Sequence, residues 1–206
     1  MSAVSTRDTF TSAYSGQAPW DIGHPQKAIV EVADQVTGSM LDIGCGTGEH
    51  ALFFARRGHK VLGIDFLEEP IKRAKEKADD RDLPAGFLVM DALALKDLPE
   101  VFDTVIDCGL FHVFSDEDRR RYVEGLASIL KPGGKLYLLC FSDKEPGTQG
   151  PRRISKKELR RAFAGGWEIE SIQAARFEVV PNLKDLVFSK GGPKAWFAVI
   201  RKGDRH

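Results

Sequence analysis

The chain has 206 residues, 42% of them hydrophobic, which is enough for one well-cored domain and short for two. Its 30 basic and 30 acidic residues cancel, so no overall charge attracts nucleic acid or a membrane surface, and we expect a small-molecule partner. It contains no apolar run near the roughly 18 residues that span a bilayer, and residues 1–16 lack the core of a signal peptide. We therefore expect a cytoplasmic monomer.

Two parts are expected, a lid segment at residues 1–24 and a single domain at residues 25–206. Residues 1–18 are polar and rich in Ser, Thr and Gly, so we expect them to be mobile until a ligand binds. Residues 19–25 read Pro-Trp-Asp-Ile-Gly-His-Pro. Two interpretations of this stretch are open: Trp20 packs on the core and Pro25 starts a helix, or Trp20, Asp21 and His24 close over a ligand.

Strands and helices are predicted to alternate along the rest of the chain. Apolar residues at helical spacing predict helices at residues 26–36, 49–57, 70–77, 116–130 and 156–164. Short apolar runs predict strands at residues 40–43, 61–64, 86–90, 102–108, 135–141, 167–174 and 194–201. The alternation predicts an α/β fold: a Rossmann-like, doubly wound sheet of seven strands, mostly parallel, with helices on both faces. The last two strands lack a clear long helix between them, which predicts an antiparallel closure of the sheet.

The first predicted strand ends abruptly in a glycine-rich turn. Glycines at positions 44, 46 and 48 allow positive φ and let a ligand approach the main chain, while the following helix directs free N–H groups at the turn. Such a turn indicates a nucleotide or nucleoside site. The spacing from Asp42 through Gly44 and Gly46 to Gly48 differs from the dinucleotide fingerprint Gly-x-Gly-x-x-Gly, and no Lys-Ser/Thr pair follows to hold a phosphate-bound metal.

Acidic residues follow or end the neighbouring strands. In an open α/β sheet the ligand lies outside the carboxyl ends of the strands, where Asp65, Asp91 and Asp107 fall in this chain. Asp65 is expected to accept hydrogen bonds from both hydroxyls of a ribose, and Asp91 with Ala92 to contact an adenine edge. Helix capping is the alternative role for Asp65 and Asp91.

Taken in order, these motifs resemble those of the class I S-adenosylmethionine-dependent methyltransferases. The resemblance is carried by residues 41–48, 65, 90–92, 102–107 and 130–135. Residues 19–23 and 107–112 are similar to the thiopurine and thiol methyltransferase group of small-molecule enzymes, whose members cover the cofactor with a Trp-bearing stretch. Cys108 stands where thiopurine methyltransferases carry an arginine, which argues against thiopurines as acceptors.

The resemblance implies S-adenosylmethionine as cofactor and S-adenosylhomocysteine as product. The residues expected to bind the cofactor are Trp20, Asp42, Gly44, Cys45, Gly46, Gly48, Asp65, Phe66, Asp91, Ala92, Asp107 and Cys108. No metal is expected, because the three cysteines have neither zinc nor disulfide spacing and Cys140 is interpreted as a core residue.

The expected reaction is methyl transfer to the sulfur, oxygen or nitrogen of a small, largely apolar acceptor. The sulfonium already activates the methyl group, so a thiol needs little help, whereas a phenol with a pKa near 10 benefits from a base. His112 is the candidate base, with a core histidine as the alternative role. The residues expected to contact the acceptor are Tyr14, His24, Phe111, His112 and Arg152, with apolar walls from Trp20, Phe111, Phe114 and Phe188.

Other classes of protein remain as alternatives. A non-catalytic S-adenosylmethionine-binding module would share the same motifs. A nicotinamide-dependent oxidoreductase would need the wider glycine spacing and a Tyr-Lys or metal dyad, which the sequence lacks. The basic residues between positions 152 and 161 are interleaved with Glu158 and accompanied by no aromatic ladder, so they are interpreted as a solvated face and not as an RNA site.

Overall fold

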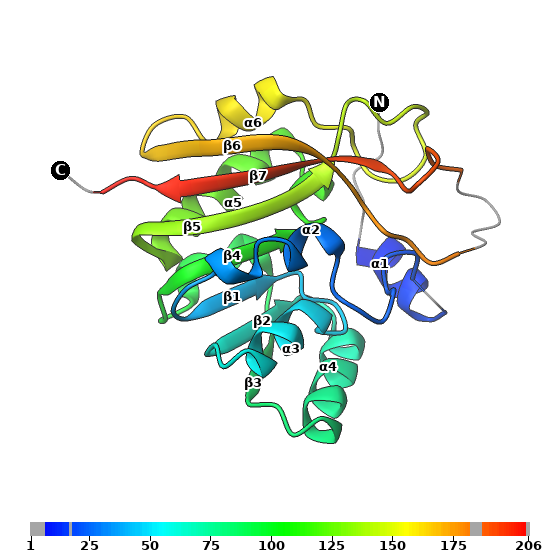
Figure 1. Cartoon of the computed structure of the whole chain (residues 1–206), viewed down its shortest axis with the longest axis vertical. Coiled ribbons are helices and arrows are strands. Elements are labelled where there is room, and N and C mark those ends of the chain that lie inside the picture. The colour runs from blue at the N-terminus through cyan, green and yellow to red at the C-terminus, as the bar shows by residue number, and fades with distance from the viewer. Residues whose placement is uncertain (1–6, 17, 182–186, 205–206) are drawn as a thin grey trace.

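A computed structural model of the chain describes residues 7–16, 18–181 and 187–204. Its seven strands form a single sheet in the order β3-β2-β1-β4-β5-β7-β6 (Figure 1). The strands are β1 (Met40–Ile43), β2 (Val61–Asp65), β3 (Ala85–Val89), β4 (Phe102–Cys108), β5 (Leu130–Phe141), β6 (Trp167–Arg176) and β7 (Lys194–Lys202). Neighbours from β3 through β5 pair in parallel, and β7 runs antiparallel to both β5 and β6. The predicted seven-stranded, mostly parallel sheet with an antiparallel closing strand is therefore confirmed.

The strand order reverses between β1 and β4. The chain proceeds outward from β1 to β3 and then returns to place β4 against the other side of β1. At such a reversal the connections leave the sheet in opposite directions and open a crevice at the carboxyl ends of the strands. The glycine turn follows β1 directly, so the topology places it at this crevice.

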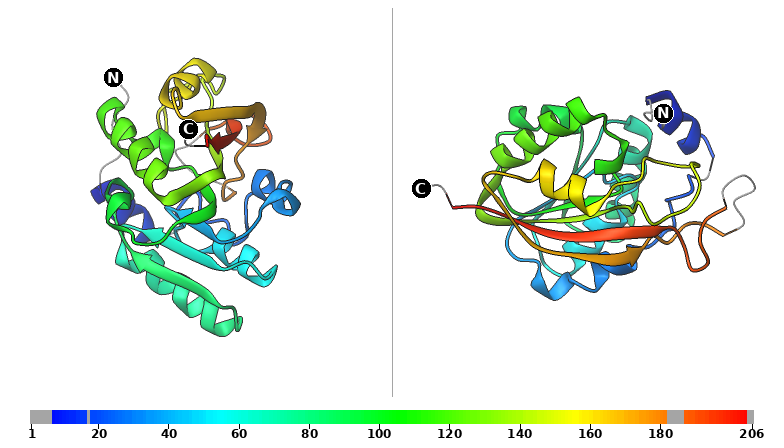
Figure 2. Two further views of the ribbon diagram at one scale, coloured as in Figure 1. Left: turned by 90° about the vertical axis from the view of Figure 1, so that its left-hand side faces the viewer. Right: turned by 90° about the horizontal axis from the view of Figure 1, so that it is seen from above.

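Helices cover both faces of the sheet, as Figures 1 and 2 show. One face carries α2 (Lys27–Val30), α3 (Glu49–Arg56) and α4 (Glu68–Asp80), and the other carries η2 (Ala92–Asp97), α5 (Asp116–Ile129) and α6 (Lys156–Ala162). Each face has its own buried apolar cluster, one containing Phe54 and Tyr137 and the other Tyr122 and Leu138. The fully buried strand β1 contributes to both, which explains why every residue of it except Asp42 is apolar.

Two expected elements differ in the structure. The helix expected at residues 26–36 is broken into α2 and the 3₁₀ turn η1 (Ala33–Gln35), with Val32 outside helical φ/ψ between them. The β-branched residues Ile29, Val30 and Val32 lose side-chain freedom in a helix and weaken it here. Strand β5 begins at Leu130, five residues before the expected start, so residues 131–134, which lie between the expected helix and strand, belong to this strand.

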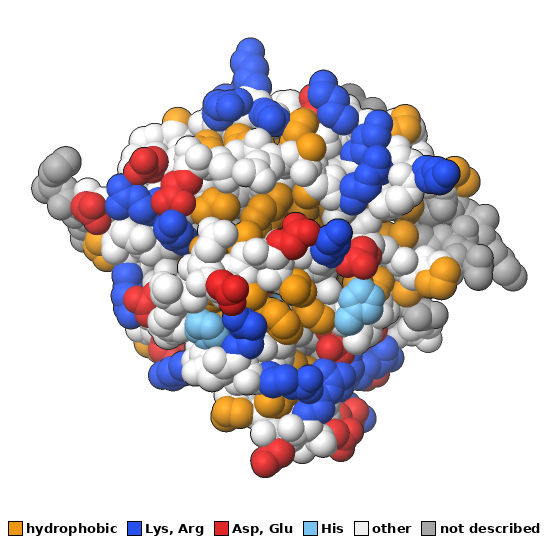
Figure 3. Space-filling view, viewed as in Figure 1, with side chains coloured by type: hydrophobic (Ala, Val, Ile, Leu, Met, Phe, Trp, Pro, Cys, Tyr) orange, Lys and Arg blue, Asp and Glu red, His pale blue; other side chains and the backbone are white. Residues whose placement is uncertain are grey.

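A small third cluster lies at the carboxyl end of the sheet, where α1 (Arg7–Tyr14) packs. Figure 1 places α1 at the end toward which β5 points, away from the C-terminus. Tyr14 and Leu67 are buried in this cluster, and Phe10 and Phe66 pack on them. Side chains of both charges are spread over the face seen in Figure 3. Among the helices of the described residues, none has both the length and the apolar character that crossing a bilayer requires.

Candidate functional site

The three glycines of the turn have different neighbours. Gly44, Gly46 and Gly48 all have positive φ, at 68°, 52° and 87°. A Cβ on Gly48 would lie 2.9 Å from both the Ala74 side chain and the Phe87 ring, so this glycine lets α3 start against α4 and β3. A Cβ on Gly46 would lie 2.7 Å from the Tyr14 hydroxyl. The turn is thus packed closely on one side by the sheet and on the other by α1.

Asp65, at the end of β2, is bonded to the glycine turn. Its Oδ2 accepts a hydrogen bond from the Gly46 N–H at 3.1 Å, and its Oδ1 accepts one from the Leu67 N–H at 3.0 Å. Burial raises the pKa of this carboxyl group, and the two N–H donors oppose that shift. A carboxylate has about four acceptor sites, so Asp65 holds the turn and keeps acceptor capacity for a ligand.

A cavity of about 190 Å³ opens beside the turn; we call it the carboxyl-end cavity. Its lining includes six residues that the sequence singled out, namely Gly44, Asp65, Phe66, Asp91, Ala92 and Phe114. Asp91 lines the cavity and also caps η2, because its carboxylate accepts a hydrogen bond from the Leu93 N–H at 2.8 Å. Its role as a helix cap, the alternative named above, is therefore compatible with a place beside a ligand. Sequence reasoning missed Phe10, Leu110 and Asp118, which reach the cavity from α1, from the loop after β4 and from α5.

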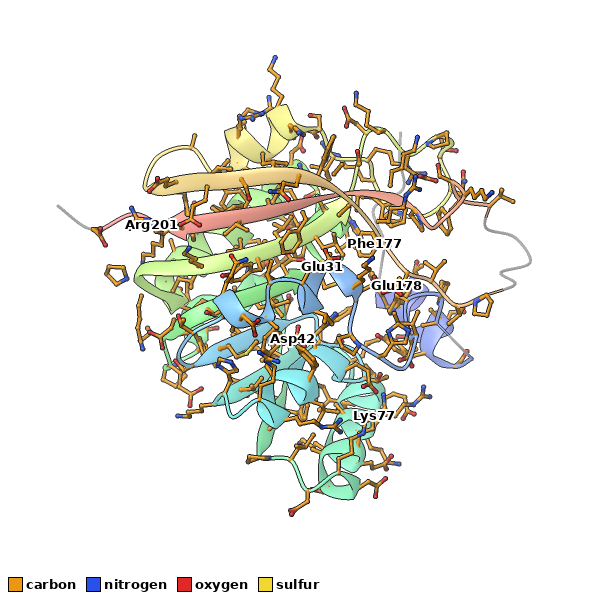
Figure 4. All side chains as sticks on the ribbon, in the orientation of Figure 1. Glu31, Asp42, Lys77, Phe177, Glu178 and Arg201 are labelled. Atoms are coloured by element: carbon orange, nitrogen blue, oxygen red, sulfur yellow. The ribbon has the colours of Figure 1, made fainter. Side chains whose placement is uncertain are left out.

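Asp42 and Asp107 occupy a different position from Asp65. Asp42 accepts from the Ala51 N–H at 3.2 Å and lies between β1 and α3 (Figure 4). Asp107 accepts from the Leu110 and Phe111 N–H groups and from the Tyr122 hydroxyl. Burial raises the pKa of Asp42 to about 7 and that of Asp107 to about 6. Neither lines the carboxyl-end cavity, and both serve to fix the backbone around it.

The cysteines at the strand ends are buried in packing contacts. Cys45 directs its thiol to the Gly46 carbonyl at 3.7 Å, and Cys108 packs against the apolar cluster of the α3 face. Burial raises the pKa of both thiols. Neither lines the carboxyl-end cavity, which favours the interpretation of these cysteines as core residues over the predicted contact with a cofactor.

The segment from α1 to residue 22 lies against the turn. The Trp20 indole N–H donates to the Tyr14 hydroxyl at 3.0 Å, and the Trp20 ring packs edge-on against Phe10 and Tyr14. The Thr47 hydroxyl donates to Asp21 at 2.7 Å. Trp20 therefore packs on α1 and not on the main core, and it does not line the carboxyl-end cavity, so its role as a cover over a ligand stays a prediction. Of the expected lid, residues 1–6 and 17 lie outside the described residues.

His112 is held as a core histidine. The ring is 5% exposed, and its Nδ1 accepts a hydrogen bond from the Phe141 N–H at 2.9 Å. Burial, with Arg153 and Arg119 nearby, lowers its pKa to about 3. A neutral imidazole whose Nδ1 accepts carries its proton on the other nitrogen, so neither nitrogen is free to take a proton. This placement does not support the prediction of a general base and matches the alternative of a core histidine.

Two of the expected acceptor contacts lie elsewhere. Phe111 is fully buried on the α5 face, stacked on Phe163 at 5.8 Å between ring centres, and faces neither cavity. Arg152 forms ion pairs with Asp116 at 2.7 Å and with Glu158 at 2.8 Å, so it links α5 to α6. Both residues lie near the expected strand ends, but the Phe111 ring packs into the core and Arg152 is held in ion pairs, so neither lines a cavity.

A second, larger cavity of about 390 Å³ lies between the N-terminal segment and the chain that connects β6 to β7; we call it the connection cavity. Its walls come from Ile22, His24, residues 177–181 and the pair Gly191 and Gly192. Of the expected acceptor contacts, His24 lines it. Phe188 does not line it but packs on Phe141, at 5.7 Å between ring centres.

Tyr14, another expected acceptor contact, is buried against the glycine turn. Burial raises the pKa of its hydroxyl, so the hydroxyl stays protonated.

Comparisons with known proteins agree with this geometry. Residues 40–134 match the family described as a methyltransferase domain. The 2-heptyl-1-hydroxyquinolin-4(1H)-one methyltransferase of Mycobacteroides abscessus is 34% identical over 183 residues, which cover 82% of this chain and 81% of that protein. The probable thiol methyltransferase 2 of Arabidopsis thaliana is 30% identical over 176 residues, covering 82% and 76%. A solved structure concerned with conversion of a disulfide bond into a thioacetal group during echinomycin biosynthesis has a TM-score of 0.84 at 36% identity, covering 98% and 94%.

Proposed function

Because the chain belongs to the S-adenosylmethionine-dependent methyltransferases, we propose that it transfers a methyl group to the oxygen, sulfur or nitrogen of a small, largely apolar acceptor. The relatives named above act on a hydroxyquinolone and, by name, on thiols. Both are acceptors of low molecular weight whose reacting atom ionises more readily than an alcohol. We infer that this chain takes an acceptor of the same kind.

The residues around the carboxyl-end cavity fit the cofactor. Gly44 lines this cavity and has no side chain, so a ligand could approach its main chain closely. Asp65 would accept from the ribose hydroxyls, Asp91 and Ala92 would contact the adenine edge, and Phe66 and Phe114 would pack on the base. The bound cofactor supplies a methyl group already activated on a sulfonium. The chain's own residues therefore have to bind, orient and exclude water.

The states of His112 and Tyr14, two of the candidate bases, support an acceptor that ionises by itself. Nδ1 of His112 is occupied by the Phe141 N–H, and the Tyr14 hydroxyl stays protonated. A thiol, with a pKa near 8.5, supplies a useful fraction of anion at neutral pH without help, whereas a phenol near 10 supplies far less. We therefore place thiols and acidic hydroxylated heterocycles ahead of simple phenols.

The observation that carries the proposal is Asp65, bonded to the Gly46 N–H and lining the carboxyl-end cavity. Calorimetry with S-adenosylhomocysteine should show binding by the intact protein. Asp65→Ala should weaken it about 10- to 100-fold, because hydrogen bonds to a charged group contribute about 1.5–3 kcal/mol. Asp80→Ala, an exposed acid on α4, is the matched control and should bind normally. Undiminished binding by Asp65→Ala would contradict the assigned cofactor site.

Turnover separates an enzyme from a binding module. A panel of an aromatic thiol, a phenol and a 2-alkyl-1-hydroxyquinolin-4-one, each incubated with S-adenosylmethionine, should yield methylated product from at least one acceptor. Mass spectrometry of the product identifies the methylated atom. Binding of the cofactor without any product across the panel would favour the non-catalytic alternative.

A further inference from the structure

We propose that the connection cavity is the acceptor site, that it takes a flat apolar ring system, and that Gln26 is the positioning residue that forms it. This inference rests on the proposed methyl transfer. It adds where the acceptor binds and what shape of acceptor the site takes. Its parts come from residues 22–26, next to the Trp-bearing stretch, and from residues 177–181 and 191–192, which no motif marks.

The connection cavity lies next to the end of β4, across from the carboxyl-end cavity. Phe177 lines it, and a Cβ built on Gly109 would touch the Phe177 ring at 3.6 Å. The next residue along the chain, Leu110, lines the carboxyl-end cavity. The two cavities are therefore separated by the short turn after β4 and by the Phe177 ring. Methyl transfer between ligands in the two cavities would therefore require their reacting atoms to approach each other past this turn.

The walls of the connection cavity suit an aromatic ligand. Ile22, Val180 and Pro181 join Phe177 in the lining. Behind it, the Phe177 ring packs on Phe141 at 5.2 Å between ring centres, so it is fixed in place. A volume of about 390 Å³ falls in the range of about 300–1,000 Å³ typical of small-molecule sites. The two polar side chains of the lining, His24 and Glu178, are exposed at its mouth, where Figure 4 shows Glu178 beside Phe177.

Gln26 joins the two walls of this cavity. Its side chain is buried, its Nε2 donates to the Glu178 carbonyl at 2.8 Å, and its Oε1 accepts from the Glu178 N–H at 2.8 Å. The Lys27 N–H donates to the Glu178 carboxylate at 2.9 Å, and the Val180 N–H donates to the Pro19 carbonyl at 3.0 Å. One buried amide thus bonds both backbone groups of a residue 152 positions away. This exchange holds residues 177–180 against the N-terminal segment.

Gly192 closes the opposite side of the cavity. It has φ of +97°, and a Cβ there would lie 2.0 Å from the Phe177 carbonyl oxygen. The Phe177 N–H donates to the Pro193 carbonyl at 2.9 Å. The backbone before β7 therefore lies directly against the backbone of Phe177. Only glycine at position 192 allows this close approach. The connection cavity is built by specific contacts on both sides and is not a loose gap between loops.

Filling the cavity tests the site. Ile22→Trp and, at the exposed mouth, His24→Trp should weaken binding of 2-naphthalenethiol by at least about tenfold, measured by titration into protein saturated with S-adenosylhomocysteine. Both variants should bind S-adenosylhomocysteine as the wild type does. The control is Val101→Trp, which adds the same ring at an exposed residue just before β4, at the amino end of the sheet. It should leave the dissociation constants of 2-naphthalenethiol and S-adenosylhomocysteine unchanged. Turnover of 2-mercaptoethanol, which is smaller, should fall much less than that of the naphthalene.

Gln26→Met tests the positioning role, because methionine keeps the length of the side chain and removes both hydrogen bonds. We expect KM for 2-naphthalenethiol to rise about tenfold, with kcat and the affinity for S-adenosylhomocysteine nearly unchanged. Loss of two buried hydrogen bonds lowers the melting temperature in either case, whereas a merely structural role would also weaken binding of S-adenosylhomocysteine. If Gln26→Met leaves KM unchanged in a folded protein, the positioning role is contradicted.

The outcomes separate this inference from the proposed function. If the wild type binds no S-adenosylhomocysteine or methylates no acceptor, the proposed function fails. If the wild type does both, and the folded Ile22→Trp and His24→Trp variants bind 2-naphthalenethiol normally, the acceptor lies elsewhere and only the present inference is overturned. If Ile22→Trp does not fold, His24→Trp decides the matter alone.

Discussion

The buried acids at the strand ends lie where the sequence predicts them, but only one of the three lines a cavity. Asp65 faces a cavity, whereas Asp42 and Asp107 accept hydrogen bonds from the backbone around the glycine turn. All three fall at the carboxyl ends of β1, β2 and β4. The sequence predicts that place, but the direction of a side chain follows from the local turn. The same reasoning explains Phe111, which belongs to the predicted region but points into the core of the α5 face.

Glycine roles divide in the same way. The pattern of three alternating glycines predicts a turn with positive φ, and all three have it. What the pattern does not reveal is the neighbour of each: Gly46 lies against Tyr14, and Gly48 lies against Ala74 and Phe87. Contacts of this kind join distant parts of the chain, so no local periodicity reports them.

Burial of Asp42 predicts a pH dependence of stability. Its pKa in the folded protein is about 7 against an ordinary value of 3.8. Between these values the folded state holds a proton that the unfolded state has lost, so stability falls as pH rises, by at most about 1.4 kcal/mol per pH unit for one group, and levels off above pH 7. Asp42→Asn removes this titration. Urea unfolding from pH 4.5 to 8.5 should show the wild type losing stability relative to Asp42→Asn across that window.

Asp103 provides the control of opposite sign. The Lys131 ammonium lowers the pKa of Asp103, so the stability that this group contributes is present above its ordinary pKa and is lost as pH falls. Asp103→Asn should therefore change the dependence of unfolding stability on pH only at acidic pH, near and below the ordinary pKa of an aspartate. A difference between wild type and Asp42→Asn that stays constant from pH 4.5 to 8.5 would contradict the assigned protonation of Asp42.

At the scale of elements, the N-terminal segment is fastened to α4 and to the glycine turn by a few polar bonds. The Thr47 hydroxyl donates to Asp21 and accepts from the Lys77 ammonium at 2.8 Å. Arg73 on α4 donates to the Tyr14 carbonyl at 3.1 Å. The Lys77 ammonium also pairs with Glu49 at 2.8 Å. These bonds connect α1 and Asp21 to α4 and to the glycine turn, beside the small apolar cluster of α1.

Thr47→Val should loosen the segment without unfolding the protein. Valine keeps the shape of threonine and removes the bond to Asp21, a hydrogen bond to a charged group worth about 1.5–3 kcal/mol. We expect amide hydrogen exchange in residues 7–22 to accelerate about tenfold or more, and the dissociation constant for S-adenosylhomocysteine to rise several-fold. Exchange in β1 and β4 should be unchanged, since local opening does not require global unfolding.

The matched control is Thr104→Val on β4. Thr104 is buried and donates to the Thr37 carbonyl at 3.0 Å, so the same change removes one hydrogen bond far from the segment. Its effect should be on global stability and not on exchange in residues 7–22. Equal exchange in the segment of wild type and Thr47→Val would show that Asp21 does not hold it.

At the scale of the whole molecule, the fold was predictable because its signals are local. Apolar runs mark β1 and β4, helical stripes mark α3 and α5, and their alternation fixes a mainly parallel sheet with its ligand edge at the carboxyl ends. The carboxyl-end cavity follows from that edge. The connection cavity does not, because Gln26 and Glu178 lie 152 residues apart and residues 177–192 carry no periodic pattern. Sequence reasoning therefore named several residues of the carboxyl-end cavity, whereas among the expected acceptor contacts it named only His24 of the connection cavity.

The arrangement of the two cavities predicts how ligand binding stabilises the molecule. The carboxyl-end cavity is lined from β2, α1, α5 and the loop after β4, so a ligand there contacts parts of the chain that pack on different clusters. At a concentration 100 times the dissociation constant, binding to the folded state alone adds about 2.7 kcal/mol. For a chain of this length, that corresponds to about 5–10 °C in Tm. S-adenosylhomocysteine should thus raise Tm in a single transition, in proportion to the logarithm of its concentration.

Two variants make this measurement specific. Asp65→Ala should lose most of the shift in Tm, because it lacks the carboxylate that lines the carboxyl-end cavity. Ile22→Trp should keep all of it, because Ile22 lines only the connection cavity. A shift that disappears in both variants would mean that the two cavities act as one site; a shift retained in both would place the cofactor outside the carboxyl-end cavity. Loss in Asp65→Ala alone is the result that the two-cavity arrangement requires.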